Sequence, residues 1–122
     1  MSSGHRVVYH NNGAKADAAA YFSGLMVSLE NHLAAAPDAE IVVVSQAGGV
    51  GMFRMAADDA NLRGTIAALR GRGVRFLVCA NTLAANGLAW SDLPDVAAGD
   101  VVPSGVAALA DFQLRGFAYI HL

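Results

Sequence analysis

Residues 40–45 read EIVVVS, and the unbroken apolar run Ile41–Val44 within them decides the fold class. A strand with one face in water alternates apolar and polar residues, whereas a strand covered on both faces is apolar at successive positions. The run therefore predicts a buried strand in a parallel sheet.

Short β-rich runs and helical patterns alternate on both sides of this strand. The expected strands are residues 6–10, 40–45, 74–79, 101–102 and 117–121. The expected helices open near Lys15 and stop before Pro37, run from about 58–59 to Gly73, cover about 82–86, and run from a first turn containing Pro103 to Gly116. This alternation is typical of an α/β fold with a parallel sheet. With no internal repeat or linker in the sequence, we expect a single domain over residues 1–122.

The composition is apolar for a domain of this size. Of 122 residues, 55% are hydrophobic and 15% are charged. In a typical soluble domain roughly a quarter of the residues are charged. Surplus apolar residues on a small domain favour an interface, so we expect a homo-oligomer. The cluster Met52, Phe53 and Met55 could belong to the core or to that interface, and we favour the interface. An alanine-rich bias with small apolar residues on helix exteriors is the alternative.

The charge and the cysteine content limit which binding partners and which cellular compartment we expect. The net charge is −2 and the basic residues are scattered, which argues against nucleic-acid binding. The single cysteine cannot form an intrachain disulfide and suits a reducing compartment. No signal-peptide core precedes the first strand, and no apolar run reaches the ~18–20 residues of a membrane helix. We therefore expect a cytoplasmic protein without membrane contact.

Cys79 ends the strand expected at residues 74–79. Ligands bind beyond the carboxyl ends of parallel strands, and the helix that follows would lower the pKa of the thiol through its N-terminal N–H groups. Asn81 or Thr82 is expected as the N-cap of that helix. The opposing interpretation is an inert core residue, since free cysteines are among the most buried residues.

Two loops at the same sheet edge supply candidate binding residues. In SQAGGVGMF (45–53), the amides of Gly48 and Gly49 could bind an anion, although a simple strand-to-helix turn is the alternative. In YHNNG (9–13), His10 could orient or protonate a bound group and Asn11 could contact it, although a solvated loop is the commoner arrangement. The glycines fit neither G-x-G-x-x-G nor a P-loop, and no His/Cys pair has metal-ligand spacing. We expect no metal and no cofactor.

Four stretches taken together resemble a known family. They are VVYH (7–10), NHLAAAPDAEIVVVSQAGGV (31–50), LRGRGVRFLVCANTL (69–83) and VVPSGVAALADFQLRGFAYI (101–120). Their order and spacing are similar to the DsrE/DsrF-like family of small sulfur-relay proteins, in its stand-alone branch. The resemblance implies a three-layer α/β/α sandwich with a mostly parallel five-stranded sheet, and assembly as a trimer or hexamer. It also implies a persulfide on one cysteine, for which Cys79 is the candidate.

Three functions remain open from the sequence. The preferred hypothesis is a sulfur carrier that accepts sulfane sulfur on Cys79 and passes it to a partner thiol, with transferase chemistry rather than acid and base catalysts. The second is a non-catalytic oligomeric binding or assembly module in which Cys79 is structural. The third is a small-ligand enzyme that uses the loop Gly48–Gly51 as an anion cradle.

Overall fold

Five strands form one sheet in the order β4-β3-β2-β1-β5, and every neighbouring pair is parallel. The computed structural model describes residues 4–13 and 16–122. The strands are β1 (Arg6–Asn11), β2 (Glu40–Ser45), β3 (Arg75–Cys79), β4 (Val101–Val102) and β5 (Ala118–His121). β2 and β4 have the predicted bounds, and the other three differ from prediction by one residue at one end. The parallel sheet expected from the run at Ile41–Val44 is confirmed.

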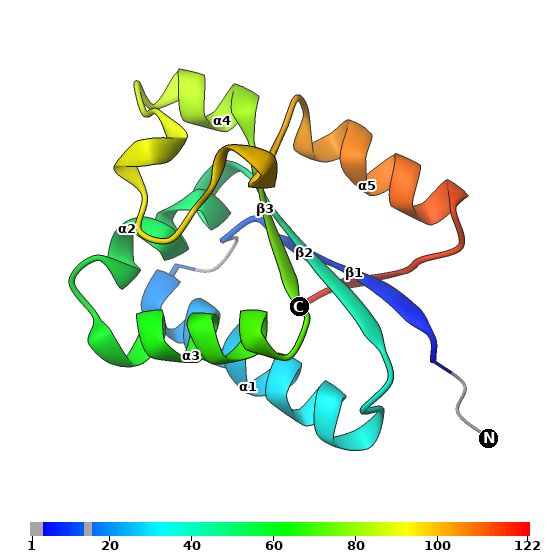
Figure 1. Cartoon of the computed structure of the whole chain (residues 1–122). Coiled ribbons are helices and arrows are strands. Elements are labelled where there is room, and N and C mark those ends of the chain that lie inside the picture. The colour runs from blue at the N-terminus through cyan, green and yellow to red at the C-terminus, as the bar shows by residue number, and fades with distance from the viewer. Residues whose placement is uncertain (1–3, 14–15) are drawn as a thin grey trace.

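Helices cover both faces of the sheet. They are α1 (Ala18–Ala35), α2 (Gly51–Ala56), α3 (Ala60–Gly71), α4 (Ala80–Ala85) and α5 (Gly105–Leu114), with 3-10 turns η1 (Ala47–Val50), η2 (Trp90–Asp92) and η3 (Ala98–Asp100). The first three helices lie on one side of the sheet and α5 on the other (Figure 1). The three-layer α/β/α sandwich is confirmed. No helix within residues 4–13 and 16–122 is long and apolar enough to cross a membrane.

The side chains of β2 divide between two hydrophobic clusters. Ile41 and Val43 pack with α1, α2 and α3, and Val42 and Val44 pack under α5. Because each face has its own cover, neither set reaches water, which explains the unbroken apolar run.

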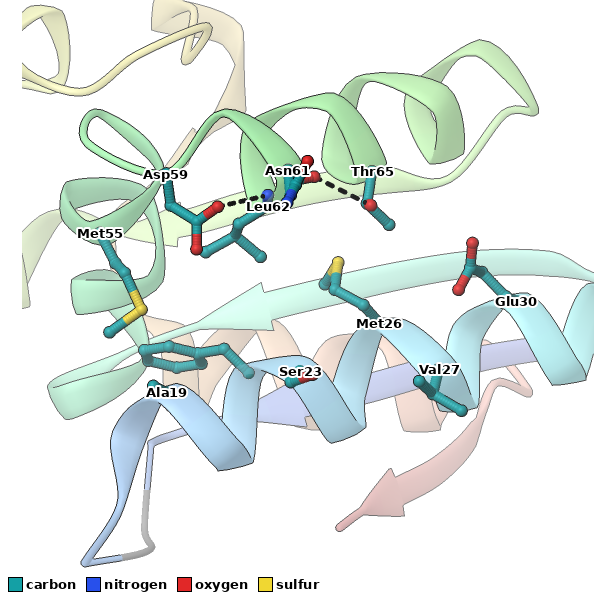
Figure 2. Close-up of a pocket in the computed structure, with 11 residues that line it drawn as sticks. Ala19, Ser23, Met26, Val27, Glu30, Met55, Asp59, Asn61, Leu62 and Thr65 are labelled. Atoms are coloured by element: carbon teal, nitrogen blue, oxygen red, sulfur yellow. Dashed lines mark hydrogen bonds between the residues drawn. The ribbon is translucent and has the colours of Figure 1, made fainter.

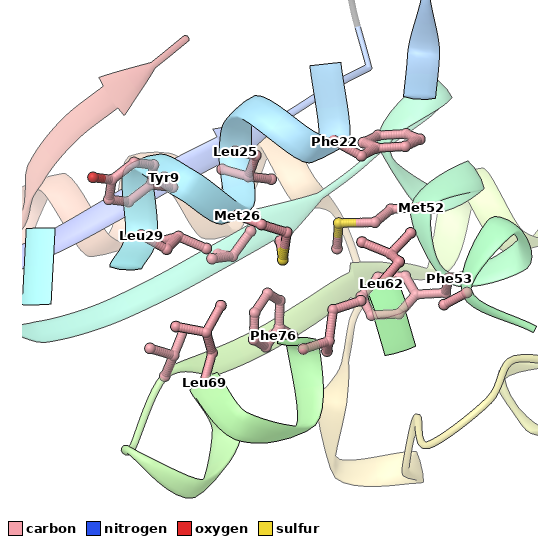
Figure 3. Packing of buried hydrophobic residues seen from close by; sticks show 14 of the residues in the cluster. Tyr9, Phe22, Leu25, Met26, Leu29, Met52, Phe53, Leu62, Leu69 and Phe76 are labelled. Atoms are coloured by element: carbon pink, nitrogen blue, oxygen red, sulfur yellow. The ribbon is translucent and has the colours of Figure 1, made fainter. Parts of the chain in front are cut away.

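Met52 and Phe53 belong to the larger of these clusters and not to an oligomer interface. Their side chains lie between α1, α3 and the sheet (Figure 3) and are 0% and 1% exposed. The interface expected at these two residues is therefore wrong. η1 and α2 follow β2 directly, and the apolar side of α2 faces the hydrophobic cluster.

Side-chain caps fix three helix starts. Asp17, Asp59 and Ser104 each accept an N–H from the third residue beyond, at 3.0, 3.0 and 3.2 Å. Ser104 as the N-cap corrects the expectation that Pro103 lies in the first turn of its helix, since the helix begins only at Gly105. The start of the first helix near Lys15 lies outside the described residues, and α1 begins at Ala18.

Candidate active site at the carboxyl edge of the sheet

Cys79 lies where two helices begin. It is the last residue of β3 and the N-cap of α4, so no connecting residue separates strand from helix. This corrects the expected N-cap at Asn81 or Thr82: the helix starts two residues earlier, because the extended backbone of Cys79 itself serves as the cap. On the other side, the N–H of Gly105, the first residue of α5, donates to the Cys79 sulfur at 3.2 Å. The thiol is 4% exposed.

Burial and hydrogen bonding act on this thiol in opposite directions. Burial is the largest single influence and raises the pKa of Cys79. The N–H groups of Thr82 and Gly105, the Thr82 hydroxyl and the N–H of Asn81 together outweigh it, and the pKa lies below the usual thiol value. The site therefore favours an anion on sulfur although it is almost closed to water.

Thr82 connects the thiol to the glycine-rich turn. Its hydroxyl oxygen accepts the N–H of Ala47 at 2.9 Å, which leaves the hydroxyl proton for the Cys79 sulfur. The side chain thus fixes the start of η1 against the start of α4. Asn81 is exposed, and its backbone N–H is the group that acts on Cys79.

Gln46 is a neighbour of Cys79 that the sequence did not reveal. The pairing of β2 with β3 ends at Ser45 opposite Val78, and the residues that follow these two, Gln46 and Cys79, lie next to each other just beyond it. Both lie against Gly105: a Cβ there would stand 2.7 Å from Gln46 Oε1 and 3.3 Å from Cys79 Cβ. A parallel register is set by tertiary pairing, and no local motif signals it.

His10 lies on the far side of Gln46 from Cys79. Gln46 Nε2 donates to His10 Nε2 at 3.0 Å, so the His10 proton is on Nδ1 and is donated to the Tyr119 hydroxyl at 2.6 Å. The pKa of His10 is lowered by burial and, to a lesser extent, by His121, whose ring lies 5.3 Å away. Both influences favour the neutral imidazole. Gln46 therefore lies between His10 on β1 and Cys79 on β3.

Asn11, Gly48 and Gly49 serve the packing of this edge. Asn11 is 0% exposed, and its Nδ2 donates to Ser45 Oγ at 3.1 Å and to the Gly49 carbonyl at 3.2 Å. A Cβ at Gly49 would collide with the Asn11 carbonyl, and one at Gly48 would stand 3.0 Å from the carbonyl of Asn12. The Gly49 N–H is already donated to the Gln46 carbonyl at 2.8 Å. The glycines allow the close backbone approach that their sequence indicates.

A groove of about 250 Å³ lies on the other side of the sheet, between α1 and α3 (Figure 2). Two polar side chains on its rim bond within their own helix: Asp59 caps α3 by accepting the Leu62 N–H, and Thr65 Oγ1 donates to the Asn61 carbonyl at 3.0 Å. Nothing in the groove resembles the donor set around Cys79. Among residues 4–13 and 16–122, no group of three or more His, Cys, Asp or Glu is arranged to hold a metal ion.

The family and the fold of the chain follow from its similarity to other proteins. The family model for the DsrE/DsrF-like family matches residues 5–122. Among solved structures, the chain is similar to a protein of unknown function, MTH1491, from Methanobacterium thermoautotrophicum. The two share 35% sequence identity with a TM-score of 0.82, over 97% of this chain and 99% of that one. Among curated proteins, none matches the sequence. The chain belongs to the DsrE/DsrF-like family.

Proposed function

We propose that this protein is a sulfur carrier that holds sulfane sulfur as a persulfide on Cys79 and delivers it to the thiol of a partner. In loading, the Cys79 thiolate attacks the outer sulfur of a donor R–S–S–H. A new S–S bond forms, the donor S–S bond breaks, and R–S⁻ leaves with the electron pair while the hydrogen stays on the transferred sulfur. In delivery, an acceptor thiolate attacks that outer sulfur, and Cys79 leaves as thiolate.

The observation that carries the proposal is the convergence of N–H and O–H donors on the Cys79 sulfur. Gly105 donates at 3.2 Å, and Thr82 and Asn81 also lower the pKa of the thiol. Such donors stabilise a thiolate before loading and the leaving thiolate after delivery. Membership of a family of sulfur-relay components agrees with this role.

The rival proposal is a binding or assembly module in which Cys79 is structural. Its 4% exposure is the observation that favours this rival. A structural cysteine in purely apolar surroundings would have a raised pKa, however, and the pKa of Cys79 is lowered. The anion-cradle enzyme has less support, since the Gly49 N–H is already bonded within the turn.

The test is intact-protein mass spectrometry after incubation with glutathione persulfide, with Cys79→Ser as the control. We expect wild-type protein to gain one or more sulfur atoms that a reductant removes, and the variant to gain none. Thermal unfolding of the variant should stay close to wild type. A folded wild-type protein that gains no sulfur, with a variant that is strongly destabilised, would establish the structural role instead.

We also propose that the carrier is a cytoplasmic homo-oligomer, a trimer or a hexamer. Three apolar side chains on α1 and α5 support an assembly, since Val27, Val106 and Leu114 are 52%, 65% and 87% exposed. A reducing compartment suits a relay through a single thiol. Light scattering coupled to size-exclusion chromatography should give three or six times the 12.6 kDa of one chain, and a monomeric mass would refute the assembly.

A further inference from the structure

A row of polar side chains crosses the sheet from Cys79 on β3 to the edge strand β5. Gln46 and Cys79 follow the last paired residues of β2 and β3, and His10 is in register with His121 on the edge strand β5. Residues of one parity in neighbouring strands point to the same face. These four side chains are therefore on the α5 side of the sheet.

The Gln46 carboxamide is held through its nitrogen, and its oxygen lies against Gly105. Its Nε2 donates to His10, which is itself held by the Tyr119 hydroxyl at 2.6 Å. Its Oε1 faces Gly105 and lies within 2.7 Å of the point where a Cβ would be, and Cys79 Cβ is 3.3 Å from that same point. The amide oxygen and the Cys79 side chain thus both lie against Gly105, in the position that a side chain at residue 105 would occupy.

Resting on the proposed sulfur-carrier function, we infer that Gln46 is a positioning residue for sulfur transfer, and that its Oε1 accepts a hydrogen bond from the S–H of the incoming persulfide. The neutral form R–S–S–H is the substrate, because an ionised persulfide would be repelled by the Cys79 thiolate and cannot donate to Oε1. That hydrogen bond places the outer sulfur beside Cys79, and the transferred sulfur keeps its hydrogen when R–S⁻ departs.

The arrangement of donors and acceptors favours this assignment. The hydrogen bonds around Cys79 come from donors, which suit an anion, whereas Gln46 Oε1 is an acceptor. His10 Nε2 accepts the Gln46 amide N–H, which keeps the amide oxygen turned toward Gly105. Tyr119 is 42% exposed, so the end of the row on β5 lies at the surface of the chain.

The experiment compares two reactions of the same thiol in Gln46→Leu. Persulfidation by glutathione persulfide needs the outer sulfur to be positioned, whereas alkylation by iodoacetamide needs only the thiolate. We expect persulfidation to slow about tenfold, the effect of losing one well-placed hydrogen bond, and alkylation to stay within about twofold of wild type. Gln113→Leu, on the exposed side of α5, is the matched control and should change neither rate.

Other outcomes overturn the inference in distinguishable ways. Equal persulfidation by wild type and Gln46→Leu, or an equal fall in both reactions, removes the positioning role and leaves the carrier function intact. A wild-type protein that takes up no sulfur overturns the carrier function itself. If Gln46→Leu does not fold, Tyr119→Phe tests the row instead. Loss of the hydroxyl that holds His10 should slow persulfidation roughly threefold. An unchanged rate in Tyr119→Phe contradicts the inference.

Discussion

Tyr9 and His10 are adjacent in sequence, yet they belong to two histidine–tyrosine clusters on opposite faces of the sheet. On the α1 side, the Tyr9 hydroxyl bonds His32 Nδ1 at 2.7 Å, and His32 Nε2 lies 2.8 Å from His5 Nε2. On the α5 side, His10 bonds Tyr119 and Gln46. Residue types and distances are alike. Only the second cluster continues, through Gln46, to the side of Cys79, so placement and not composition separates a structural cluster from a candidate functional one.

Among the substitutions, Gly105→Ala should have the largest effect on the functional cluster beside Cys79. The new methyl group would stand 2.7 Å from Gln46 Oε1 and 3.3 Å from Cys79 Cβ, so it pushes the two groups apart. A displacement of ~1 Å at a reacting group costs about a hundredfold in rate, and we expect a loss of that size in persulfidation. The measurement is the initial rate of sulfur uptake followed by mass spectrometry.

Gly24→Ala is the matched control, since Gly24 lies in α1 with open space around its Cα. Alanine there should leave sulfur uptake unchanged and stabilise the protein by about 0.4–1 kcal/mol in urea unfolding. If both alanine variants slow sulfur uptake to the same extent, the effect of Gly105→Ala is not local to Cys79, and the close approach of Gln46 has no functional meaning.

Thr82→Val should weaken the site less severely. It removes the hydroxyl that bonds Cys79 and Ala47, so the thiol keeps the effect of burial but loses one of the groups that oppose it. The pKa of Cys79 should rise, and the pH profile of iodoacetamide alkylation should move to higher pH. At pH 7 the rate should fall severalfold.

Thr65→Val applies the same change to a hydroxyl that bonds only its own helix, at the Asn61 carbonyl. Its alkylation profile should overlay that of wild type. An unshifted profile for Thr82→Val would show that the hydroxyl does not act on the thiol, and would leave the backbone N–H groups as the cause of the lowered pKa.

The parts of the fold that the sequence predicts well are those in which local pattern and burial agree. The run Ile41–Val44 identifies a strand covered on both faces. The helical spacing of Phe22, Leu25, Met26, Leu29 and Leu33 likewise matches the buried side of α1. Asp17 and Asp59 stand at the helix starts where acids are favoured. The position of Cys79 at a strand end followed by a helix is a prediction of the same kind, and it is confirmed.

The site beyond Cys79 depends on relations that the sequence does not contain. Gln46 meets Cys79 through the register of β2 on β3, and Gly105 meets both through the path of α5 over the sheet. The start of α4 differs from the prediction because Asn81 and Thr82 are good caps by residue type, whereas β3 leads into α4 without a loop and leaves Cys79 at the cap. Tertiary pairing overrides the local preference there.

The smallest effect we expect sharpens the comparison of the two histidine clusters. Burial lowers the pKa of both His10 and His32, and the neighbouring His121 and His5, respectively, lower it further. The unfolded chain, with a histidine pKa of about 6.5, therefore binds more protons than the folded protein as pH falls through that value. The free energy of unfolding should decrease from pH 7.5 to pH 5, and either His10→Gln or His32→Gln should reduce that decrease in urea titrations.

Only His10→Gln should also slow persulfidation at pH 7.5, by roughly twofold, because glutamine holds Gln46 less firmly than the ring does. An equal slowing by His32→Gln would mean that the clusters act through stability alone, and that the row from Cys79 to Tyr119 has no separate part in sulfur transfer.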